Sequence, residues 1–379
     1  MVYFDNSATT KPSKEVVEAM VDCMENFFAN PSSAHGLGLK AEKKLNESRI
    51  KVGNLIGADP DEIVFTSGGS EANNMVIRGL LKPSDHVITS TIEHPSVYNT
   101  IKSLEKSGVE VTYLDVDRNG IVNLKELSDS IKPNTKLVTI MHVNNEIGSI
   151  QPIYDIVDIV KKASKKAKVH FDIVQSAGKV KIDVKKLGVD YLSLSGHKIH
   201  GPKGVGALYM RKGLNISPII TGGGQERDLR SGTENIPAIC GFGIASEFCT
   251  NNLDENIKKV NNLKSYFVER LSEIDGILIN SPLDDSHIGN ILNVSFDGIR
   301  GEVLLHALED YDIYVSTGSA CSAKKSMSKN YVLPAIGLSS NQVQGAIRFS
   351  FSYQNTIEEV DLTIDALKKV LPFLRRINK

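Results

Sequence analysis

Short apolar runs rich in β-branched residues recur along the chain up to residue 210 and mostly alternate with stretches of helical periodicity. The runs are apolar on successive residues rather than on every second one, which is typical of strands covered on both faces. One helical stretch starts at Pro152, a residue that suits the first turn of a helix. The alternation predicts an α/β fold with a mostly parallel sheet, whose strands are expected at 86–92, 109–116, 136–143, 169–175, 191–195 and 205–210.

The pattern changes after about residue 255. A long polar helix is followed by the segments "GNILNVSF" and "GAIRFSFS", in which apolar and polar residues alternate more strongly. Such alternation suits an antiparallel sheet with one open face. The chain has 379 residues, which is enough for two or three domains. We expect a large domain over 13–255 and a small α+β domain formed by 1–12 and 256–379.

Composition excludes several functional classes. The net charge is −1 with 23% charged residues, so neither nucleic acid nor a membrane surface is an expected partner. The N-terminus lacks the features of a signal peptide, and no apolar run reaches 18 residues. The cysteines show no CxxC spacing, which argues against a zinc ribbon and a disulfide framework; they are Cys23, Cys240, Cys249 and Cys321. We expect a cytoplasmic protein.

Polar residues follow several of the expected strands. Ligands of open parallel sheets bind at the carboxyl ends of the strands, so residues at these ends are candidates for one site. They are Glu93, His94, Asn144, Asn145, Asp172, Gln175 and Ser195 to Lys198.

The segment "SLSGHKIHGPKGVG" at 193–206 allows three interpretations. A metal site would use His197 and His200, but zinc needs three or four ligands and no others with suitable spacing lie nearby. A phosphate loop of the Walker A type fails, because Pro202 occupies the position of its lysine. The third interpretation is a Schiff base between Lys198 and a carbonyl cofactor, since a lysine at a strand end can become an amine nucleophile.

Two other features fit pyridoxal phosphate (PLP) bound at Lys198. Asp172 lies in an apolar strand, where a carboxylate needs a cation such as a protonated pyridine nitrogen. The glycine turn in "FTSGGSEANN" opens a helix whose N-terminus favours a phosphate. Each residue also has an ordinary explanation: Lys198 as a surface lysine, Asp172 as a helix cap and His94 as a core histidine. Their joint placement favours the cofactor site.

The chain resembles the NifS/IscS-type cysteine desulfurases of the class-V aminotransferase family. The resemblance extends nearly from end to end, in the segments "YFDNSATT", "NPSSAHGLG", "FTSGGSEANN", "EHPSV", "MHVNNEIGSIQPI", "HFDIVQSAGK", "SGHKIHGPKGVGALY", "GGGQERDLRSGTEN", "STGSACSA" and "IRFSFS". It implies a PLP-dependent transferase of fold type I and a homodimer. It also implies conversion of L-cysteine to L-alanine, with the sulfur left as a persulfide on an enzyme cysteine.

The resemblance also implies roles for individual residues. Lys198 forms the covalent bond to PLP, Asp172 pairs with the pyridine nitrogen, Gln175 bonds the phenolic oxygen, and His94 stacks on the ring and relays protons. The phosphate is held by Gly69, Ser70, Ser195, His197 and, from the partner subunit, Thr233. Asn145 lies near the phenolic oxygen and the substrate, and Arg348 binds the substrate carboxylate. From the residues alone, the polar strand face of Arg348 could equally be solvent-exposed.

Cys321 is the sulfur acceptor that the resemblance implies, and no resident metal is expected, although this cysteine could transiently bind an iron–sulfur cluster. Its surroundings, "STGSACSA", are small residues that permit a mobile loop. Only "SAKKSMSKNYV" separates it from "LPAIGLS", which predicts a short tether and a dependence on an acceptor protein. Three basic residues near it could dock an acidic partner or be solvated lysines; they are Lys324, Lys325 and Lys329.

Other functions remain open. Selenocysteine lyase or another class-V aminotransferase-like PLP enzyme would use the same fold, although "GSAC" and "RSGT" favour the desulfurase. A non-catalytic scaffold that binds a sulfur-transfer partner is disfavoured by the intact Lys198, His94 and Cys321. The acceptor could be an iron–sulfur scaffold or a tRNA-thiolation enzyme.

Overall fold

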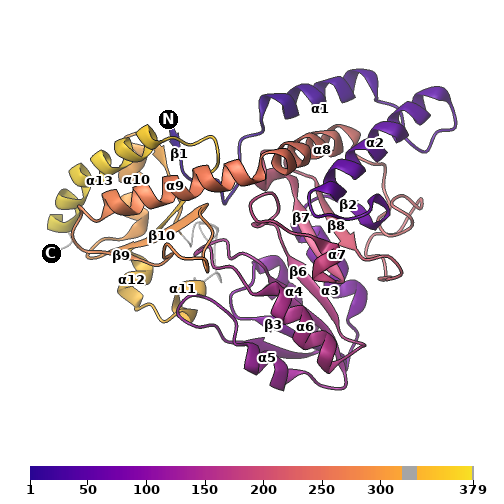
Figure 1. Ribbon diagram of the computed structural model, residues 1–379, viewed down its shortest axis with the longest axis horizontal. Coiled ribbons are helices and arrows are strands. Elements are labelled where there is room, and N and C mark those ends of the chain that lie inside the picture. The colour runs from indigo at the N-terminus through magenta and orange to yellow at the C-terminus, as the bar shows by residue number, and fades with distance from the viewer. Residues whose placement is uncertain (318–330, 378–379) are drawn as a thin grey trace.

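The computed structural model describes residues 1–317 and 331–377. The chain forms two lobes joined along one side by a long helical segment, and both termini lie at the smaller lobe (Figure 1). None of the helices in the described ranges combines the length and the apolar character needed to cross a membrane.

The larger lobe is built on a seven-stranded sheet in the order β2-β8-β7-β6-β5-β3-β4. Neighbours from β7 to β4 are parallel, whereas β8 runs antiparallel to both β2 and β7. The predicted mostly parallel sheet is therefore confirmed, with one reversed strand and with β2, which the sequence analysis did not assign. The strands are β2 (Ile63–Thr66), β3 (His86–Ser90), β4 (Glu110–Leu114), β5 (Thr135–Met141), β6 (Lys168–Asp172), β7 (Tyr191–Ser195) and β8 (Gly206–Met210).

Helices cover both faces of this sheet, and each face has its own apolar core. Side chains of α3 and α4 pack on one face, and side chains of α1, α2, α6 and α8 pack on the other. Strands buried on both sides explain why the runs are apolar on successive residues. The helices are α1 (Lys14–Asn26), α2 (Gly36–Asn54), α3 (Gly69–Leu80), α4 (Pro95–Glu105), α5 (Leu124–Ser130), α6 (Ile153–Ala163), α7 (Val184–Leu187) and α8 (Ile236–Asn251), with short 3₁₀ turns η1 (Pro60–Glu62) and η2 (Gly196–Lys198).

The smaller lobe contains an antiparallel sheet in the order β12-β10-β9. A separate core of apolar residues joins this sheet to the long helices α9, α10 and α13. Its elements are α9 (Leu253–Leu271), β9 (Ile277–Ile279), β10 (Ile291–Phe296), α10 (Gly301–Glu309), β11 (Ile313–Tyr314), α11 (Val332–Ala335), α12 (Ser340–Gln344), β12 (Ala346–Ser350) and α13 (Ile357–Ile377).

The N-terminal arm connects the two lobes. Its strand β1 (Val2–Tyr3) pairs in parallel with β11, and Phe4 packs in the core of the smaller lobe. Further along, the backbone N–H of Thr10 donates to the carbonyl oxygen of His197 at 2.9 Å, in the larger lobe. The stretch between these two anchors therefore passes beside the turn that holds Lys198.

Candidate active site

The carboxyl ends of four neighbouring strands bring the predicted polar residues together. His94 follows β3, Asn145 follows β5, Asp172 ends β6 and Lys198 lies in η2 directly after β7. Asp172 is paired in register with Ser193 on β7, so the ends of these strands lie at the same edge of the sheet. The parallel order of the strands explains why residues far apart in the sequence meet here.

Lys198 is a half-buried lysine whose amine is held by the N-terminal arm. Its Nζ donates to the carbonyl oxygens of Ser7 and, at 2.8 Å, of Ala8. Burial, followed by the positive charges of Lys179 and Arg348, lowers the pKa of Lys198 to about 7. A large fraction of this amine is therefore uncharged at neutral pH, which is the form that attacks a carbonyl carbon.

Asp172 is a buried carboxylate, 4% exposed, that has no cationic side chain within ion-pair distance among the described residues. Its Oδ2 accepts from Nδ2 of Asn73 at 2.8 Å, and its Oδ1 accepts from the backbone N–H of Val174 at 2.9 Å. Asp190, also buried, instead pairs with Arg211 and Lys161. A buried anion without a paired cation fits a positively charged ligand such as a protonated pyridine nitrogen.

His94 precedes α4 and caps it through its ring. Nδ1 accepts from the backbone N–H of Ser96 at 3.1 Å and lies 2.7 Å from Oγ of the same serine. An accepting Nδ1 places the ring proton on Nε2. Burial is the main cause that lowers the pKa of His94; Lys198 lowers it further and Asp172 opposes the shift. The ring is therefore a neutral imidazole with an N–H on the side away from Ser96.

Asn73, which the sequence analysis did not single out, links these groups. It lies on α3, is buried, and donates from Nδ2 to both Oδ2 of Asp172 and Oγ of Ser96, each at 2.8 Å. The hydroxyl of Ser96 in turn faces Nδ1 of His94. One amide thus orients both the carboxylate and the histidine. Its position four residues after Gly69, on the buried face of the helix, is the signal in the sequence that could have identified it.

Replacing Asn73 by alanine is expected to lower the free energy of unfolding by about 1–3 kcal/mol, because Asp172 and Ser96 lose their shared donor. Urea unfolding at pH 7 measures the effect. Asn73→Asp places a second carboxyl beside Asp172, so this variant should lose more stability at pH 8 than at pH 5, where protonation relieves the repulsion. Wild-type unfolding curves for both variants would show that the link is dispensable.

The glycine turn before α3 forms an anion cradle. Gly68 has a φ of 154°, and a Cβ built on Gly69 would lie 2.5 Å from Cγ2 of Val174. The backbone N–H groups of Gly69 and Ser70 have no acceptor within the described part of the chain. Ser195 is buried beside the turn, since its Oγ would lie 3.9 Å from a Cβ built on Gly68. Free N–H groups and the helix dipole favour a phosphate at this position.

Two further residues expected at the phosphate differ in their surroundings. His197 lies next to Lys198, with Nδ1 3.2 Å from Oγ1 of Thr9; burial and then Lys198 lower its pKa to about 4, so it is neutral. Thr233 is exposed and lines a separate cavity with Thr66 and Ser67, on the outer side of the cradle. Thr233 thus lines a different cavity from Lys198.

Gln175 is buried, contacts Lys179 directly and shares a hydrogen-bond acceptor with Lys198. Its Nε2 donates to the carbonyl oxygen of Ser7 at 2.9 Å, and its Oε1 accepts from Nζ of Lys179 at 3.2 Å. The same carbonyl oxygen of Ser7 also accepts from Lys198. Gln175 and Lys198 therefore donate to the same carbonyl oxygen, so the two side chains lie close together.

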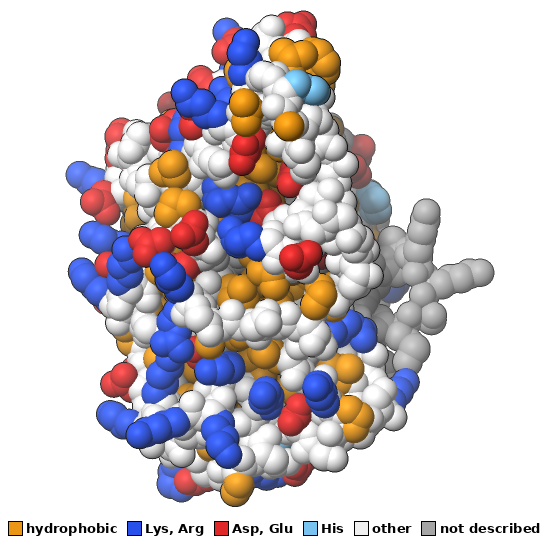
Figure 2. Space-filling view, turned by 90° about the vertical axis from the view of Figure 1, so that its right-hand side faces the viewer, with side chains coloured by type: hydrophobic (Ala, Val, Ile, Leu, Met, Phe, Trp, Pro, Cys, Tyr) orange, Lys and Arg blue, Asp and Glu red, His pale blue; other side chains and the backbone are white. Residues whose placement is uncertain are grey.

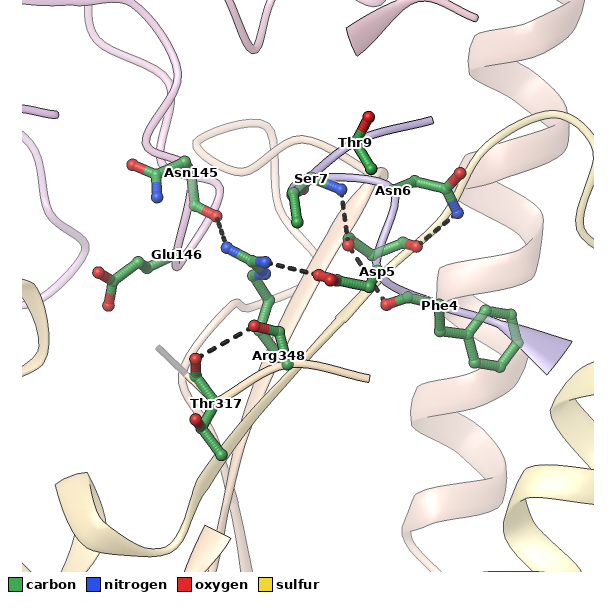
Figure 3. A network of polar contacts seen from close by, with 12 residues as sticks. Phe4, Asp5, Asn6, Ser7, Thr9, Asn145, Glu146, Thr317 and Arg348 are labelled. Carbon is green, nitrogen blue, oxygen red and sulfur yellow. Dashed lines mark hydrogen bonds and ion pairs between the residues drawn. The ribbon is translucent and has the colours of Figure 1, made fainter. Parts of the chain in front are cut away.

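Arg348 extends from β12 of the smaller lobe into a polar network at the site (Figure 3). Its Nη2 pairs with Oδ1 of Asp5 at 2.7 Å, and its Nη1 donates to the carbonyl oxygen of Asn145 at 2.9 Å. The side chain of Asn145 points away from the guanidinium (Figure 3). Arg348 is only 6% exposed, and its Nε has no partner in the described ranges. The structure thus places the arginine in the interior of the molecule, an alternative that the sequence left open.

The candidate Cys321 lies outside the described residues, as do Lys324, Lys325 and Lys329. The residues that flank this gap contact the site from two sides. Ser316 exchanges backbone hydrogen bonds with Arg348, at 2.7 and 3.2 Å. Tyr331 donates its hydroxyl to the carbonyl oxygen of Glu93, and its ring stacks on Tyr98 with centroids 5.2 Å apart. Described residues on both sides of this gap therefore contact residues of the site.

Glu93 is a second buried carboxyl group near Asp172. Burial raises its pKa to about 8, and the negative charge of Asp172 adds to this rise. Its Oε1 accepts from Oγ of Ser90 at 2.5 Å and from the backbone N–H of Met141 at 3.1 Å. The Glu93 carboxyl group is thus mostly neutral at pH 7.

Comparison with known proteins places this geometry in a family. Residues 2–363 match the family described as aminotransferase class-V. A cysteine desulfurase IscS from Methanosarcina thermophila is 44% identical over 381 residues, covering 100% of this chain and 93% of the relative.

Solved structures agree with the sequence comparison. A NifS-like protein superposes with a TM-score of 0.93 at 43% identity, over 98% of this chain and 100% of that one. The structure of SspA in complex with cysteine superposes with a TM-score of 0.80 at 36% identity, over 94% and 100% of the two chains.

Proposed function

Because the chain belongs to the class-V aminotransferase family, in which its relatives are cysteine desulfurases, we propose that it transfers the sulfur of L-cysteine to Cys321 and releases L-alanine. The protein is a PLP-dependent cysteine desulfurase of fold type I. When bound, PLP supplies a carbonyl carbon that condenses with amines and a protonated pyridine ring that withdraws electrons from the substrate. The side chains of the site would bind the cofactor, orient the substrate and exchange protons with it.

The single observation that best supports the proposal is that one site contains both a buried carboxylate without a cationic partner in the described part of the chain and a lysine with a lowered pKa. Asp172 has no cation of its own among the described residues and would hold the pyridine nitrogen, while Lys198 presents an amine of which about half is uncharged at pH 7. The cradle formed by Gly69, Ser70 and Ser195 would hold the phosphate. Anion, amine and phosphate cradle are the three features that PLP requires.

Arg348 would orient the substrate through its carboxylate. The guanidinium is buried and held by Asp5 and the Asn145 carbonyl, and its Nε, which has no partner among the described residues, could donate to a planar anion. His94 offers its Nε2–H, and Lys198 offers Nζ, as groups that exchange protons with the substrate.

Cys321 is proposed as the nucleophile that receives the sulfur. It attacks the substrate sulfur as a thiolate, so that the new S–S bond forms as the carbon–sulfur bond breaks and the carbon later gains a proton. The flanks at Ser316 and Tyr331 support a reach from this segment to the site.

The direct test is incubation of the purified PLP-loaded protein with L-cysteine. We expect one alanine for each L-cysteine consumed. In the absence of reductant, mass spectrometry should also detect a mass increase of one sulfur atom on the peptide that contains Cys321. Alanine without a persulfide on that peptide would contradict the proposed acceptor. Activity confined to L-selenocysteine would instead support a selenocysteine lyase.

A homodimer completes the proposed site, with Thr233 reaching the partner's phosphate cradle. Thr233 is exposed and lines a different cavity from Lys198, which supports a role across an interface. Apolar side chains lie at the surface at the top of the molecule, where α1 and α2 lie (Figure 2). Exposed apolar patches of this kind mark interaction surfaces, and this one consists of Val17, Val21, Met24, Phe28, Leu37 and Leu39.

The double variant Met24→Asp/Phe28→Asp is therefore expected to sediment as a monomer and to lose most of its turnover, because buried charges disfavour the interface. Analytical ultracentrifugation combined with an alanine assay measures both effects. Thr233→Val is the matched control, which should stay dimeric and bind PLP more weakly. A monomer with full activity would contradict the shared site.

The sulfur acceptor is proposed to be a protein, either an iron–sulfur scaffold or a tRNA-thiolation enzyme. The name of the relative from Methanosarcina thermophila supports the first, and the short tether after Cys321 supports dependence on a docked acceptor. Alanine formation with dithiothreitol, with and without each acceptor, distinguishes them; fast turnover without any acceptor would contradict the dependence. The cytoplasmic location stays a prediction, and so does the division of the chain into a large domain (13–255) and a small domain (1–12 and 256–379).

A further inference from the structure

Lys179 is a charged residue of the site to which neither the fold nor the proposed reaction assigns a role. It lies in the segment between β6 and α7, is half-buried, and lines the same small cavity as Lys198 and Cys249. Its Nζ donates to Oε1 of Gln175 at 3.2 Å, and within the described residues no carboxylate lies within ion-pair distance of it. A half-buried ammonium that lacks a counter-ion loses part of its hydration without a compensating charge, so a purely structural role explains it poorly.

The contact of Lys179 with Gln175 fixes the orientation of the amide. A lysine can only donate, so the atom of Gln175 that faces it is the carbonyl oxygen. The amide N–H₂ then points to the opposite side, where it donates to the Ser7 carbonyl oxygen at 2.9 Å. That oxygen also accepts from Nζ of Lys198. Lys179, Gln175, Ser7 and Lys198 thus form one continuous chain of polar contacts.

We propose that Lys179 is a positioning residue of the active site, which directs the Gln175 amide toward the cofactor side and adds a positive charge that favours the uncharged form of the Lys198 nitrogen. The proposal deepens the function given above and rests on it, because it assumes that Lys198 binds PLP. It assigns Lys179 no contact with the substrate.

The titratable groups around Lys198 come from five separate parts of the chain. Lys179 and Arg348 are positive, whereas Asp5 and Asp172 are negative, and the nearby rings of His94 and His197 are neutral. After burial, Lys179 is the largest cause that lowers the pKa of Lys198. Burial lowers the pKa of Lys179 itself, to about 8, so Lys179 stays mostly charged at pH 7.

Lys179→Met removes the charge and keeps an unbranched side chain, whereas Lys179→Arg keeps the charge. The readout is the pH midpoint of the visible absorption band of the holoenzyme, which reports the protonation of the Lys198 nitrogen bonded to PLP. A second readout is the pH midpoint for acetylation of Lys198 in the full-length protein freed of PLP, measured by quantitative peptide mass spectrometry. Exposed Lys181, in the same segment, provides the matched control Lys181→Met.

Removal of a neighbouring positive charge raises the pKa of a cationic nitrogen, so Lys179→Met is expected to raise both midpoints by on the order of one pH unit. Lys179→Arg and Lys181→Met should stay near the wild type. If Lys179→Met lowers the melting temperature and leaves both midpoints unchanged, Lys179 is only structural and the inference is wrong. Failure of the wild type to form alanine from L-cysteine would contradict the proposed function instead, whatever the acetylation midpoints are.

Discussion

Lys198→Ala is expected to lower alanine formation from L-cysteine by about 10⁴-fold. The variant loses both the nitrogen that bonds PLP and the group that exchanges protons with the substrate. No other amine replaces it, because Lys179 is held by Gln175 through a 3.2 Å hydrogen bond and is the more strongly protonated of the two. The visible band of the lysine-bound cofactor should also disappear.

Borohydride reduction followed by peptide mapping gives an independent measurement. In the wild type, the pyridoxyl group should appear on the peptide of Lys198, and in Lys198→Ala on none. Lys203, an exposed lysine of the same loop, provides the control Lys203→Ala, which should keep both the label and the turnover. A label on Lys203 would show that the assignment of Lys198 is wrong.

Asp172→Asn is expected to lower turnover by on the order of 10²–10³-fold, since the site loses the charge that keeps the pyridine nitrogen protonated. The fold should tolerate the change. The new amide can still accept from the N–H of Val174. Its N–H₂ replaces the oxygen that faces Nδ2 of Asn73, and a flip of the Asn73 amide would turn its Oδ1, which has no partner among the described side chains, toward this new donor. Relief of an unpaired buried charge also favours the folded state, so the free energy of unfolding should change by less than about 1 kcal/mol.

Asp190→Asn is the matched control for this prediction. Asp190 is another buried aspartate of the same sheet, but Arg211 and Lys161 compensate its charge. The side chains of Arg211 and Lys161 are 40% and 35% exposed, so water can solvate both cations after the replacement. We therefore expect a loss of stability on the order of 1 kcal/mol and no specific loss of turnover. Nearly normal turnover in Asp172→Asn would show that its carboxylate is structural.

Much of the fold follows from local pattern. Strands buried on both faces are apolar on successive residues, and this signal predicted β3 to β7 and the predominance of parallel pairing. The reversal of β8 could not be predicted in this way, because an antiparallel strand inside a covered sheet has the same composition as its parallel neighbours. The four residues of β2 are too few to show a period.

Some features of the site could likewise be predicted from the sequence, whereas others depend on contacts between elements. The sequence by itself determined which residue types stand at the strand ends, since Lys198, Asp172, His94 and the glycine turn occupy positions that strand and helix boundaries define. It also determined the family, because long motifs in a fixed order cover nearly the whole chain. It did not determine the roles of Asn73 and Lys179, which depend on contacts between elements.

Only the tertiary structure decided which charges share the interior. Asp5 and Arg348 pair at 2.7 Å although 343 residues separate them along the chain, and this pair is what removes Arg348 from solvent. The pKa of Lys198 falls to about 7 because burial, Lys179 and Arg348 act on it together, and these causes come from separate segments. Desolvation and Coulomb interaction depend on distance and surroundings in space, so residue order alone could not supply them.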